Sequence, residues 1–204
     1  MAKKKAQTEN RRAIAFHEAG HAVAAWLFGE IPIQITVLNE AMDVARGRLG
    51  SVAVDSPIGL FSVIDAMNRD SRAGRQCAAR AIVGFMAGPC AEGICTSNHY
   101  WYREMVALRN IEGSDAHWVL EFAAQVYLPE ARRHQRWLAT LRDWTQELLS
   151  APRVWTVVET LALQLTATDV LDDLDAMIVM DEAWGTQDAI PIESLGARWR
   201  RRFQ

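Results

Sequence analysis

Two histidines and a glutamate near the N-terminus have the residue types and the spacing of a metal-dependent hydrolytic site. His17, Glu18 and His21 form the pattern His-Glu-x-x-His. Four residues is slightly more than one helical turn, so His17 and His21 share a helix face, with Cβ atoms about 5–6 Å apart. Two imidazoles so placed can hold one Zn²⁺ at about 2.0–2.1 Å from each nitrogen. Glu18 can then reach a water held by the metal, which is the position of a general base.

The residues around this pattern predict a largely buried helix. We expect the helix to run from about Glu9 to Phe28, with Gly29 as its stop, after a solvated start over residues 1–8. Three ionisable groups on a buried helix are costly unless something pairs with them, and a metal is the simplest partner. The alternative is an ordinary solvated helix. The apolar flanks disfavour it: Ile14, Phe16, Val23, Trp26 and Leu27.

A zinc site of this kind needs a third protein ligand and leaves a fourth position for water. Residue chemistry alone does not choose among the candidates, which are Glu92, His99, Asp115, His117 and His134. Asp115 also has a purely structural explanation, because it follows Ser114, a favourable N-cap, and complements the dipole in the first turn of a helix. His117 lies two residues beyond Asp115 and points away from it on a helix, which argues against both binding one metal.

The remaining sequence predicts a mainly α (α+β) domain with a small β-sheet beside the His-Glu-x-x-His helix. Residues 33–38 alternate and are β-branched, which indicates a strand, and residues 48–54 indicate a second strand at the sheet edge. Residues 97–110 look like a loop whose aromatic side chains either line a cleft or pack over the core. Further helices are expected at about 71–87 (ended or kinked by Gly88-Pro89), 129–149, 152–166 and 169–184, with an ambiguous one at 58–70.

Size and composition fit a single metallopeptidase-like domain over residues 1–204. The chain is 50% hydrophobic and has a formal net charge of −3, which gives no reason to expect nucleic acid as a partner. Within it we expect a metal-site core (8–125), a helical C-terminal bundle (126–185) and a basic tail (186–204).

The cysteines and the hydropathy bear on the cellular compartment. Cys77, Cys90 and Cys95 cannot all pair, and no signal peptide is recognisable, so we expect a reducing cytoplasm. A second metal site at Cys90 and Cys95 is a weaker interpretation than buried thiols on a helix. No apolar run reaches the ~18 residues that a membrane span needs, so we expect no membrane span.

The sequence resembles the protease domain of the FtsH family of ATP-dependent zinc metalloproteases. The run Phe16-His17-Glu18-Ala19-Gly20-His21-Ala22-Val23 carries the resemblance most specifically. Three further segments match in the same order. Ile35-Thr36-Val37 with Leu49-Gly50 is similar to that family's strand, loop and edge strand. Ala87 to Glu92 is similar to its Gly-rich Ala-Glu motif, and Gly113-Ser114-Asp115 is similar to the segment that bears its third zinc ligand.

The resemblance implies a zincin-like fold and a role for each matching residue. His17, His21 and Asp115 would be the Zn²⁺ ligands and Glu18 the base. Glu92 would be a carboxylate that orients a ligating histidine. Leu49, Gly50 and Ser51, on the edge strand, would hold an extended peptide by main-chain pairing.

The chain also departs from the family pattern. It has no G-x-x-x-x-G-K-S/T phosphate loop, Pro89-Cys90 interrupt the Ala-Glu motif, and Ala116 stands where the family usually has Leu. We therefore expect an ATP-independent zinc metalloendopeptidase that acts on peptides or unfolded proteins, as a homo-oligomer or with a partner protein. The alternative is a regulatory or binding module that zinc stabilises, inactive or activated by a partner.

Overall fold

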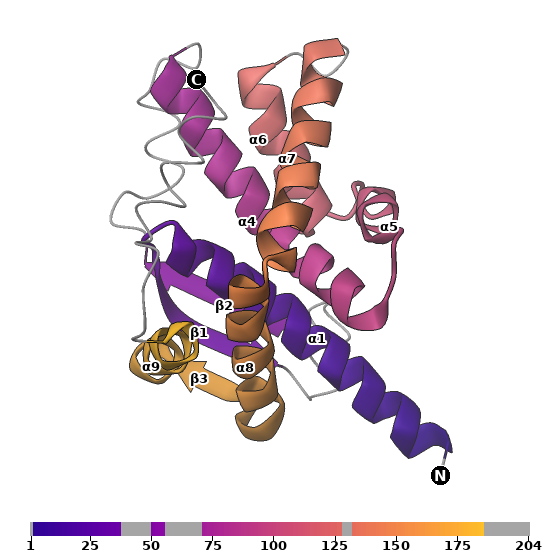
Figure 1. The fold of residues 1–204 in the computed structure, drawn as a ribbon. Coiled ribbons are helices and arrows are strands. Elements are labelled where there is room, and N and C mark those ends of the chain that lie inside the picture. The colour runs from indigo at the N-terminus through magenta and orange to yellow at the C-terminus, as the bar shows by residue number, and fades with distance from the viewer. Residues whose placement is uncertain (1, 38–49, 56–70, 128–131, 186–204) are drawn as a thin grey trace.

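The structure, a computed structural model, describes residues 2–37, 50–55, 71–127 and 132–185 (Figure 1). These residues are mainly helical with one small sheet, as the sequence predicts. In chain order the elements are α1 (Ala2–Leu27), β1 (Ile31–Val37), β2 (Gly50–Asp55), α4 (Arg72–Thr96), α5 (Trp101–Ala107), α6 (Asp115–Val126), α7 (Arg132–Ser150), α8 (Pro152–Thr168), β3 (Val170–Asp172) and α9 (Asp173–Trp184).

The sheet has three antiparallel strands in the order β2-β1-β3. The predicted edge position of β2 is confirmed, because β2 pairs with β1 alone among the described strands. Ile35 stands at the centre, opposite Val52 on one side and Leu171 on the other. Ile35 and Leu171 are both buried. The sheet therefore presents an apolar surface to the helices.

Strand β3 was not predicted, since residues 169–184 were expected as one helix. Asp169 ends α8 in a left-handed conformation, with φ of 68°, and its carbonyl accepts a hydrogen bond from the Val37 amide at 2.8 Å. The chain then pairs with β1 before Asp172 caps α9 through the Asp175 amide. Tertiary pairing with β1 therefore outweighs local helix propensity here.

Helices α1 and α4 cross at the centre of the molecule and pack very closely (Figure 1). A Cβ added to Gly20 would lie 2.7 Å from the Cβ of Ala91, so only glycine permits this approach. Of the two alternatives expected at Gly88-Pro89, an end or a kink, the end is wrong, because α4 continues to Thr96 with Pro89 inside it. Met86, Ala87, Cys90 and Ala91 around the break are all buried. Burial of this segment against α1 offsets the ~3 kcal/mol that a proline costs inside a helix.

Three other boundaries differ from the prediction. Helix α1 begins at Ala2 rather than Glu9, because Ala, Lys and Gln are good helix formers and no breaker intervenes. The expected loop at 97–110 contains α5, which buries Trp101 and Met105 one turn apart. Helix α9 begins at Asp173, whereas the sequence predicted a helix from residue 169. Leu49, the ambiguous residues 58–70, Pro129 and the basic tail lie outside the described residues.

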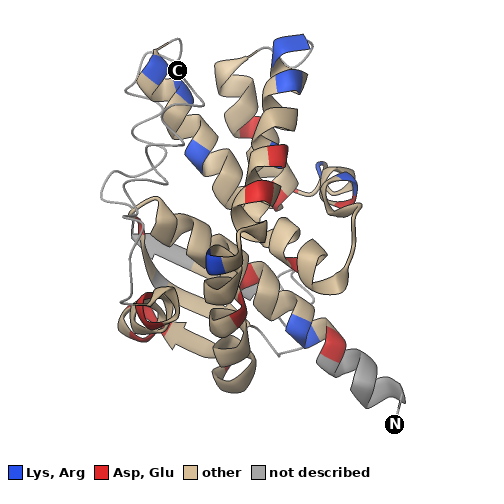
Figure 2. Ribbon diagram, in the orientation of Figure 1, with Lys and Arg blue, Asp and Glu red and all other residues tan. Residues whose placement is uncertain are grey.

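One continuous core joins these elements, drawing buried side chains from α1, α4, α6, α7, α8, α9 and the sheet. Figure 2 shows basic residues at the starts of α4 and α7 and acidic residues nearer the crossing of α1 with α4. None of the described helices is long and apolar enough to cross a lipid bilayer.

Candidate metal centre

Helix α1 presents His17 and His21 side by side on the face that packs against α4. The two ring centroids are 4.8 Å apart and nearly perpendicular, with an interplanar angle of 74°. Both side chains are mostly buried, with exposed fractions of 22% and 16%. The four-residue spacing therefore places two imidazoles in one sheltered place, as expected from helix geometry.

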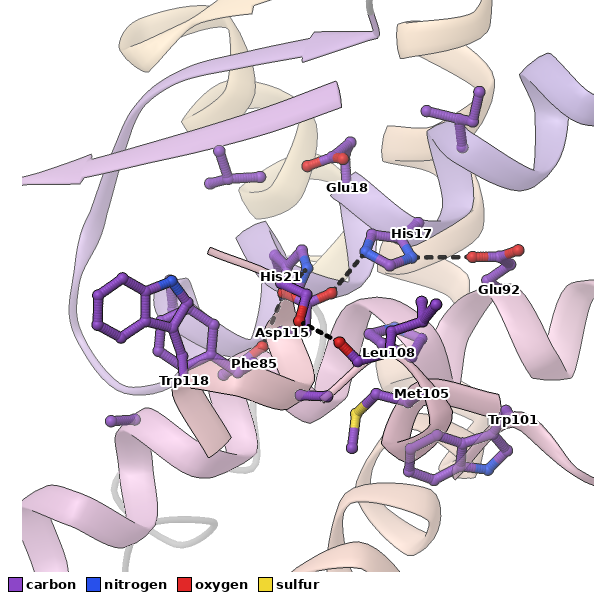
Figure 3. A pocket seen from close by; sticks show the side chains of 18 of the residues that line it. His17, Glu18, His21, Phe85, Glu92, Trp101, Met105, Leu108, Asp115 and Trp118 are labelled. Atoms are coloured by element: carbon purple, nitrogen blue, oxygen red, sulfur yellow. Dashed lines mark hydrogen bonds and ion pairs between the residues drawn. The ribbon is translucent and has the colours of Figure 1, made fainter. Parts of the chain in front are cut away.

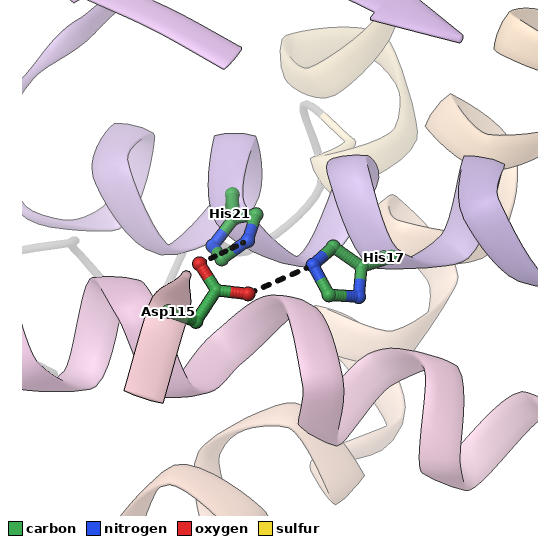
Figure 4. A group of neighbouring side chains, drawn as sticks. All are labelled: His17, His21 and Asp115. Carbon is green, nitrogen blue, oxygen red and sulfur yellow. Dashed lines mark hydrogen bonds and ion pairs between the residues drawn. The ribbon is translucent and has the colours of Figure 1, made fainter. Parts of the chain in front are cut away.

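Helix α6 brings Asp115 to the same point from about a hundred residues along the chain (Figure 4). Ser114 caps this helix by accepting a hydrogen bond from the His117 amide at 3.2 Å, which confirms the predicted N-cap. Asp115 is then the first residue of α6, and its carboxylate faces both rings. Its Oδ2 lies 3.1 Å from His17 Nε2 and its Oδ1 lies 3.4 Å from His21 Nε2.

These separations fit a shared cation. Ligand atoms that are each 2.0–2.1 Å from a tetrahedral zinc lie roughly 3.3 Å apart. His17 Nε2 lies 3.1 Å from Asp115 Oδ2 and His21 Nε2 lies 3.4 Å from Oδ1, so each ring faces a different oxygen of the carboxylate at about that separation. One ligand atom from each of His17, His21 and Asp115 lies within 4.8 Å of the others, and no other such group of three occurs among the described residues. Two imidazoles and one carboxylate form a donor set that suits Zn²⁺.

The other nitrogen of each ring also has a partner (Figure 3). His17 Nδ1 lies 2.9 Å from Glu92 Oε2. His21 Nδ1 lies 2.7 Å from the carbonyl oxygen of Gly84. A carboxylate and a carbonyl only accept, so each Nδ1 carries the proton and donates it. Nε2 of both rings is consequently the atom left to bind a metal, and such outer partners orient ligating histidines in known metal sites.

The electrostatics of the cluster favour positive charge between the carboxylate and the rings. Burial alone would lower the pKa of His17, but hydrogen bonds to Asp115 and Glu92 outweigh it and raise the pKa to about 10. The pKa of His21 is also raised, since the Asp115 carboxylate outweighs the effect of burial. Conversely, His21 and His17 overcome burial and hold the pKa of Asp115 well below its usual range. A divalent cation supplies the same positive charge at this point.

Glycine in α4 leaves room for the His21 ring. A Cβ added to Gly88 would lie 2.6 Å from Cε1 and 2.7 Å from Cδ2 of His21. Real Cβ atoms essentially never approach so closely, so a side chain at position 88 would displace the imidazole. At Gly84, one turn earlier, an added Cβ would meet nothing within 4 Å. The close crossing of α1 with α4 therefore fixes where His21 lies.

Glu18 lies next to the ligands on α1 but does not belong to the three-residue cluster. It is 6% exposed, and burial raises the pKa of its carboxyl above the usual value. Figure 3 shows it beside the rings, lining the cleft around them. A buried carboxyl with a raised pKa is suited to accept and return a proton near neutral pH.

A cleft of about 700 Å³ opens over the cluster. It is lined by His17, Glu18, His21, Glu92 and Asp115, together with residues of β2, α5 and α6. Trp101 and Met105 of α5 line the cleft and are also buried. The two expectations for residues 97–110, that their side chains line a cleft or pack over the core, therefore both hold in part. Gly50 and Ser51 lie on β2 opposite Val37 and Thr36, and the next residue, Val52, reaches the cleft.

The other candidate ligands lie elsewhere. His134 is buried and its Nδ1 is 3.2 Å from the Tyr127 carbonyl. His117 packs edge-on against Trp118, and neither it nor His99 joins the cluster. Cys77, Cys90 and Cys95 are unpaired thiols on α4. Cys90 is buried with its sulfur 3.5 Å from Gln146 Oε1, as expected for a structural thiol.

Sequence reasoning missed the backbone carbonyl of Gly84, the clearance at Gly88 and the aromatic side chains Phe85 and Trp118 in the cleft. No sequence signal marks a carbonyl as a histidine partner. The one sequence signal for a close helix crossing was the run of small residues in α4. In the comparisons with known proteins, no family model and no curated protein matches this chain.

Proposed function

We propose that this chain is a zinc-dependent metalloendopeptidase with a zincin-like site of the FtsH type, acting on flexible or unfolded polypeptides without ATP. One observation carries the proposal. The Nε2 atoms of His17 and His21 converge on the Asp115 carboxylate at zinc-ligand spacing while both Nδ1 atoms donate to fixed acceptors. That arrangement places three ionisable groups in a mostly buried position, at 22%, 16% and 24% exposure, which is unfavourable and which a purely structural helix crossing does not need.

In the proposed reaction each residue of the site has a separate role. His17, His21 and Asp115 would hold Zn²⁺, which when bound would polarise the peptide carbonyl and acidify water. Glu92 and the Gly84 carbonyl fix the orientation of the two rings. Glu18 accepts the proton of the attacking water and returns it to the leaving amine. General acid–base catalysis of this kind typically raises the rate about 10²–10⁴-fold.

The cleft supports an extended substrate. Strand β2 is a sheet edge among the described residues, and its Val52 lines the cleft beside the metal ligands. An extended peptide can add to such an edge by main-chain hydrogen bonds. A segment held in this way must be unfolded locally, so folded proteins should be poor substrates.

The test is cleavage of an unfolded, dye-labelled protein by the zinc-loaded chain, with Glu18→Gln in parallel. We expect the parent to cut and Glu18→Gln to bind zinc equally well but to lose cleavage. A Glu18→Gln variant that cuts as fast as the parent would refute the role of Glu18. Stoichiometric zinc binding, a melting temperature that falls with chelator, and no cleavage by either protein would favour a zinc-stabilised binding module instead.

A further inference from the structure

The carboxylates that line the cleft are unevenly matched with cations. Bound Zn²⁺ would offset the charge of Asp115. Burial raises the pKa of the Glu30 carboxyl, and the nearby Arg80 guanidinium partly offsets this rise. Glu92 and Glu104 also line the cleft, but neither forms an ion pair with a lysine or arginine of the described residues. The part of the cleft that holds these two carboxylates, here called the acidic end, therefore carries negative charge that no described cation offsets.

Close packing between α4 and the segment that enters α5 places the acidic end beside His17. A Cβ added to Gly93, the residue after Glu92, would lie 2.6 Å from the Trp101 Cβ and 3.0 Å from the Asn98 carbonyl oxygen. The start of α5 therefore rests on the turn of α4 that carries Glu92, whose carboxylate lies 2.9 Å from His17 Nδ1. Figure 3 shows Glu92 and Trp101 on the side of His17 that faces away from the other ligating histidine.

Hydrogen bonds hold the side chains of the acidic end in place. The indole N–H of Trp101 donates to Gln146 Oε1 on α7 at 2.7 Å. The side-chain amide of Asn98 donates to Glu104 Oε2 at 2.6 Å, and its Oδ1 accepts from the Tyr100 amide at 2.9 Å. Groups that are already fixed lose little conformational entropy when a ligand binds. The acidic end is therefore pre-organised for binding.

Each of the two carboxylates keeps an oxygen for a ligand. One oxygen of Glu92 accepts from His17 and one oxygen of Glu104 accepts from Asn98, and no described residue donates to the second oxygen of either. The Glu92 side chain is 44% exposed and Glu104 is also exposed, so both are accessible. The complementary groups are the three N–H donors of a lysine ammonium or the five of an arginine guanidinium. Met105 lines the same cleft and can cover the aliphatic stem of such a side chain.

A separate observation indicates that the cleft receives a ligand. Glu18 is 6% exposed and lines the cleft, yet no described residue donates a hydrogen bond to its carboxylate. Buried polar groups in native structures nearly always have a hydrogen-bond partner. The partner of Glu18 is therefore expected to be a molecule that enters the cleft.

We infer that the acidic end, with Glu92 and Glu104 as its charged groups and Trp101 as its wall, binds a lysine or arginine side chain of the peptide that is cut. The inference rests on the proposed peptidase function for the cutting step, but not for binding. An extended peptide whose bond lies at the metal centre places a neighbouring residue beside His17, and the His17 ring adjoins Glu92. The preferred substrate is then an unfolded segment with a basic residue close to the bond that is cut.

A binding measurement separates the acidic end from the chemistry. Three unstructured, dye-labelled peptides differ only at one position of an otherwise uncharged sequence, which is Lys, Gln or Glu. They are titrated by fluorescence anisotropy against zinc-loaded Glu18→Gln, which should hold peptide without cutting it. We expect the Lys peptide to bind about 3–10-fold more tightly than the Gln peptide, as two partly exposed ion pairs would allow, and the Glu peptide to bind most weakly. Cleavage of the Lys and Gln peptides by the parent is measured alongside.

Substitutions of Glu104 change the charge of the acidic end without touching the metal centre. Glu104→Gln removes the charge but keeps an oxygen that can accept from the Asn98 side chain, and it should lose most of the preference for Lys with zinc content unchanged. Glu104→Lys should reverse the order, so that the Glu peptide binds more tightly than the Lys peptide. The matched control is Glu121→Gln, since Glu121 is exposed on α6 and does not line the cleft. It removes the same charge from the protein and should keep the preference.

The outcomes distinguish the acidic end from the peptidase function. Equal affinity for the Lys and Gln peptides, no binding of either, or a preference that survives in Glu104→Gln overturns the basic-residue site. A preference that Glu121→Gln loses as fully as Glu104→Gln also overturns it, because the effect is then one of overall charge. Equal binding together with equal cleavage of both peptides by the parent overturns the site but leaves the peptidase standing. Lys-dependent binding that requires Glu104, without any cleavage, supports the site and refutes the proposed peptidase.

Discussion

Substituting Gly88 by alanine tests whether the helix crossing positions His21. The new Cβ would lie 2.6 Å from Cε1 of the His21 ring, whereas carbon atoms in contact are about 3.5–4.0 Å apart. The ring must therefore shift by about 1 Å. Metal ligands tolerate deviations of only about 0.2 Å from ideal distances, so His21 could not bind together with His17 and Asp115.

The expected magnitude follows from that displacement. Removing the outer hydrogen-bond partner of a ligating histidine costs about 10–100-fold in metal affinity, and Gly88→Ala displaces the ligand itself. We therefore expect zinc affinity to fall by at least about 100-fold. Overpacking at the crossing should also lower the free energy of unfolding by about 1–3 kcal/mol.

The assay is competition for zinc with a chromophoric chelator, together with a thermal melt. Gly84→Ala is the matched control, because it introduces the same methyl group one turn away into open space and keeps the carbonyl that His21 contacts. It should leave zinc affinity unchanged and stabilise α4 by about 0.5–1 kcal/mol. Equal zinc affinity in Gly88→Ala and Gly84→Ala would refute the positioning of His21 by α4.

Three further results are expected. Glu92→Ala, which removes the acceptor for His17 Nδ1, should weaken zinc binding about 10–100-fold by the same competition assay; unchanged affinity would mean that Glu92 does not orient the ring. In the chelator-treated protein the carboxylate partners of His17 raise its pKa from about 6.5 to about 10. The protonated ring therefore contributes to the free energy of unfolding, and this contribution is fully present below pH 6.5 and is lost as the pH rises toward 10. Melting temperatures should therefore fall over that range, and Asp115→Asn should flatten the profile; a profile equally steep in Asp115→Asn would contradict this origin. Burial raises the pKa of the Cys90 thiol to about 12, so iodoacetamide at pH 8 should modify Cys90 only after unfolding, as peptide mass spectrometry would show; rapid native labelling would contradict its burial.

The sequence was most informative where local signals and burial agreed. The His-Glu-x-x-His helix, strands β1 and β2 and the Ser114 cap follow from periodicity, β-branching and N-cap chemistry, and the structure contains them all. The same local rules failed where tertiary packing, rather than local propensity, determined the secondary structure. Pro89 lies inside α4 because that turn is buried against α1, and β3 forms because β1 offers an edge to Val170 and its neighbours.

The candidate site shows the same division. Helical spacing alone puts His17 and His21 together, but the third member of the cluster is about a hundred residues away, and the residues left five candidates open. The resemblance to a known family chose Asp115, and the structure brings its carboxylate to both rings. The Gly84 carbonyl contact and the place of Phe85 in the cleft arise from the packing of α4 against α1 and α6, which no local pattern encodes.

The most direct test of the central claim is a zinc X-ray absorption spectrum of the protein loaded with one equivalent of Zn²⁺. The account predicts only nitrogen and oxygen neighbours at about 2.0–2.2 Å, with the multiple-scattering signature of two imidazoles that drops to one in His21→Ala. A sulfur shell at about 2.3 Å, or a spectrum that His21→Ala leaves unchanged, would place the metal elsewhere and contradict the proposed site.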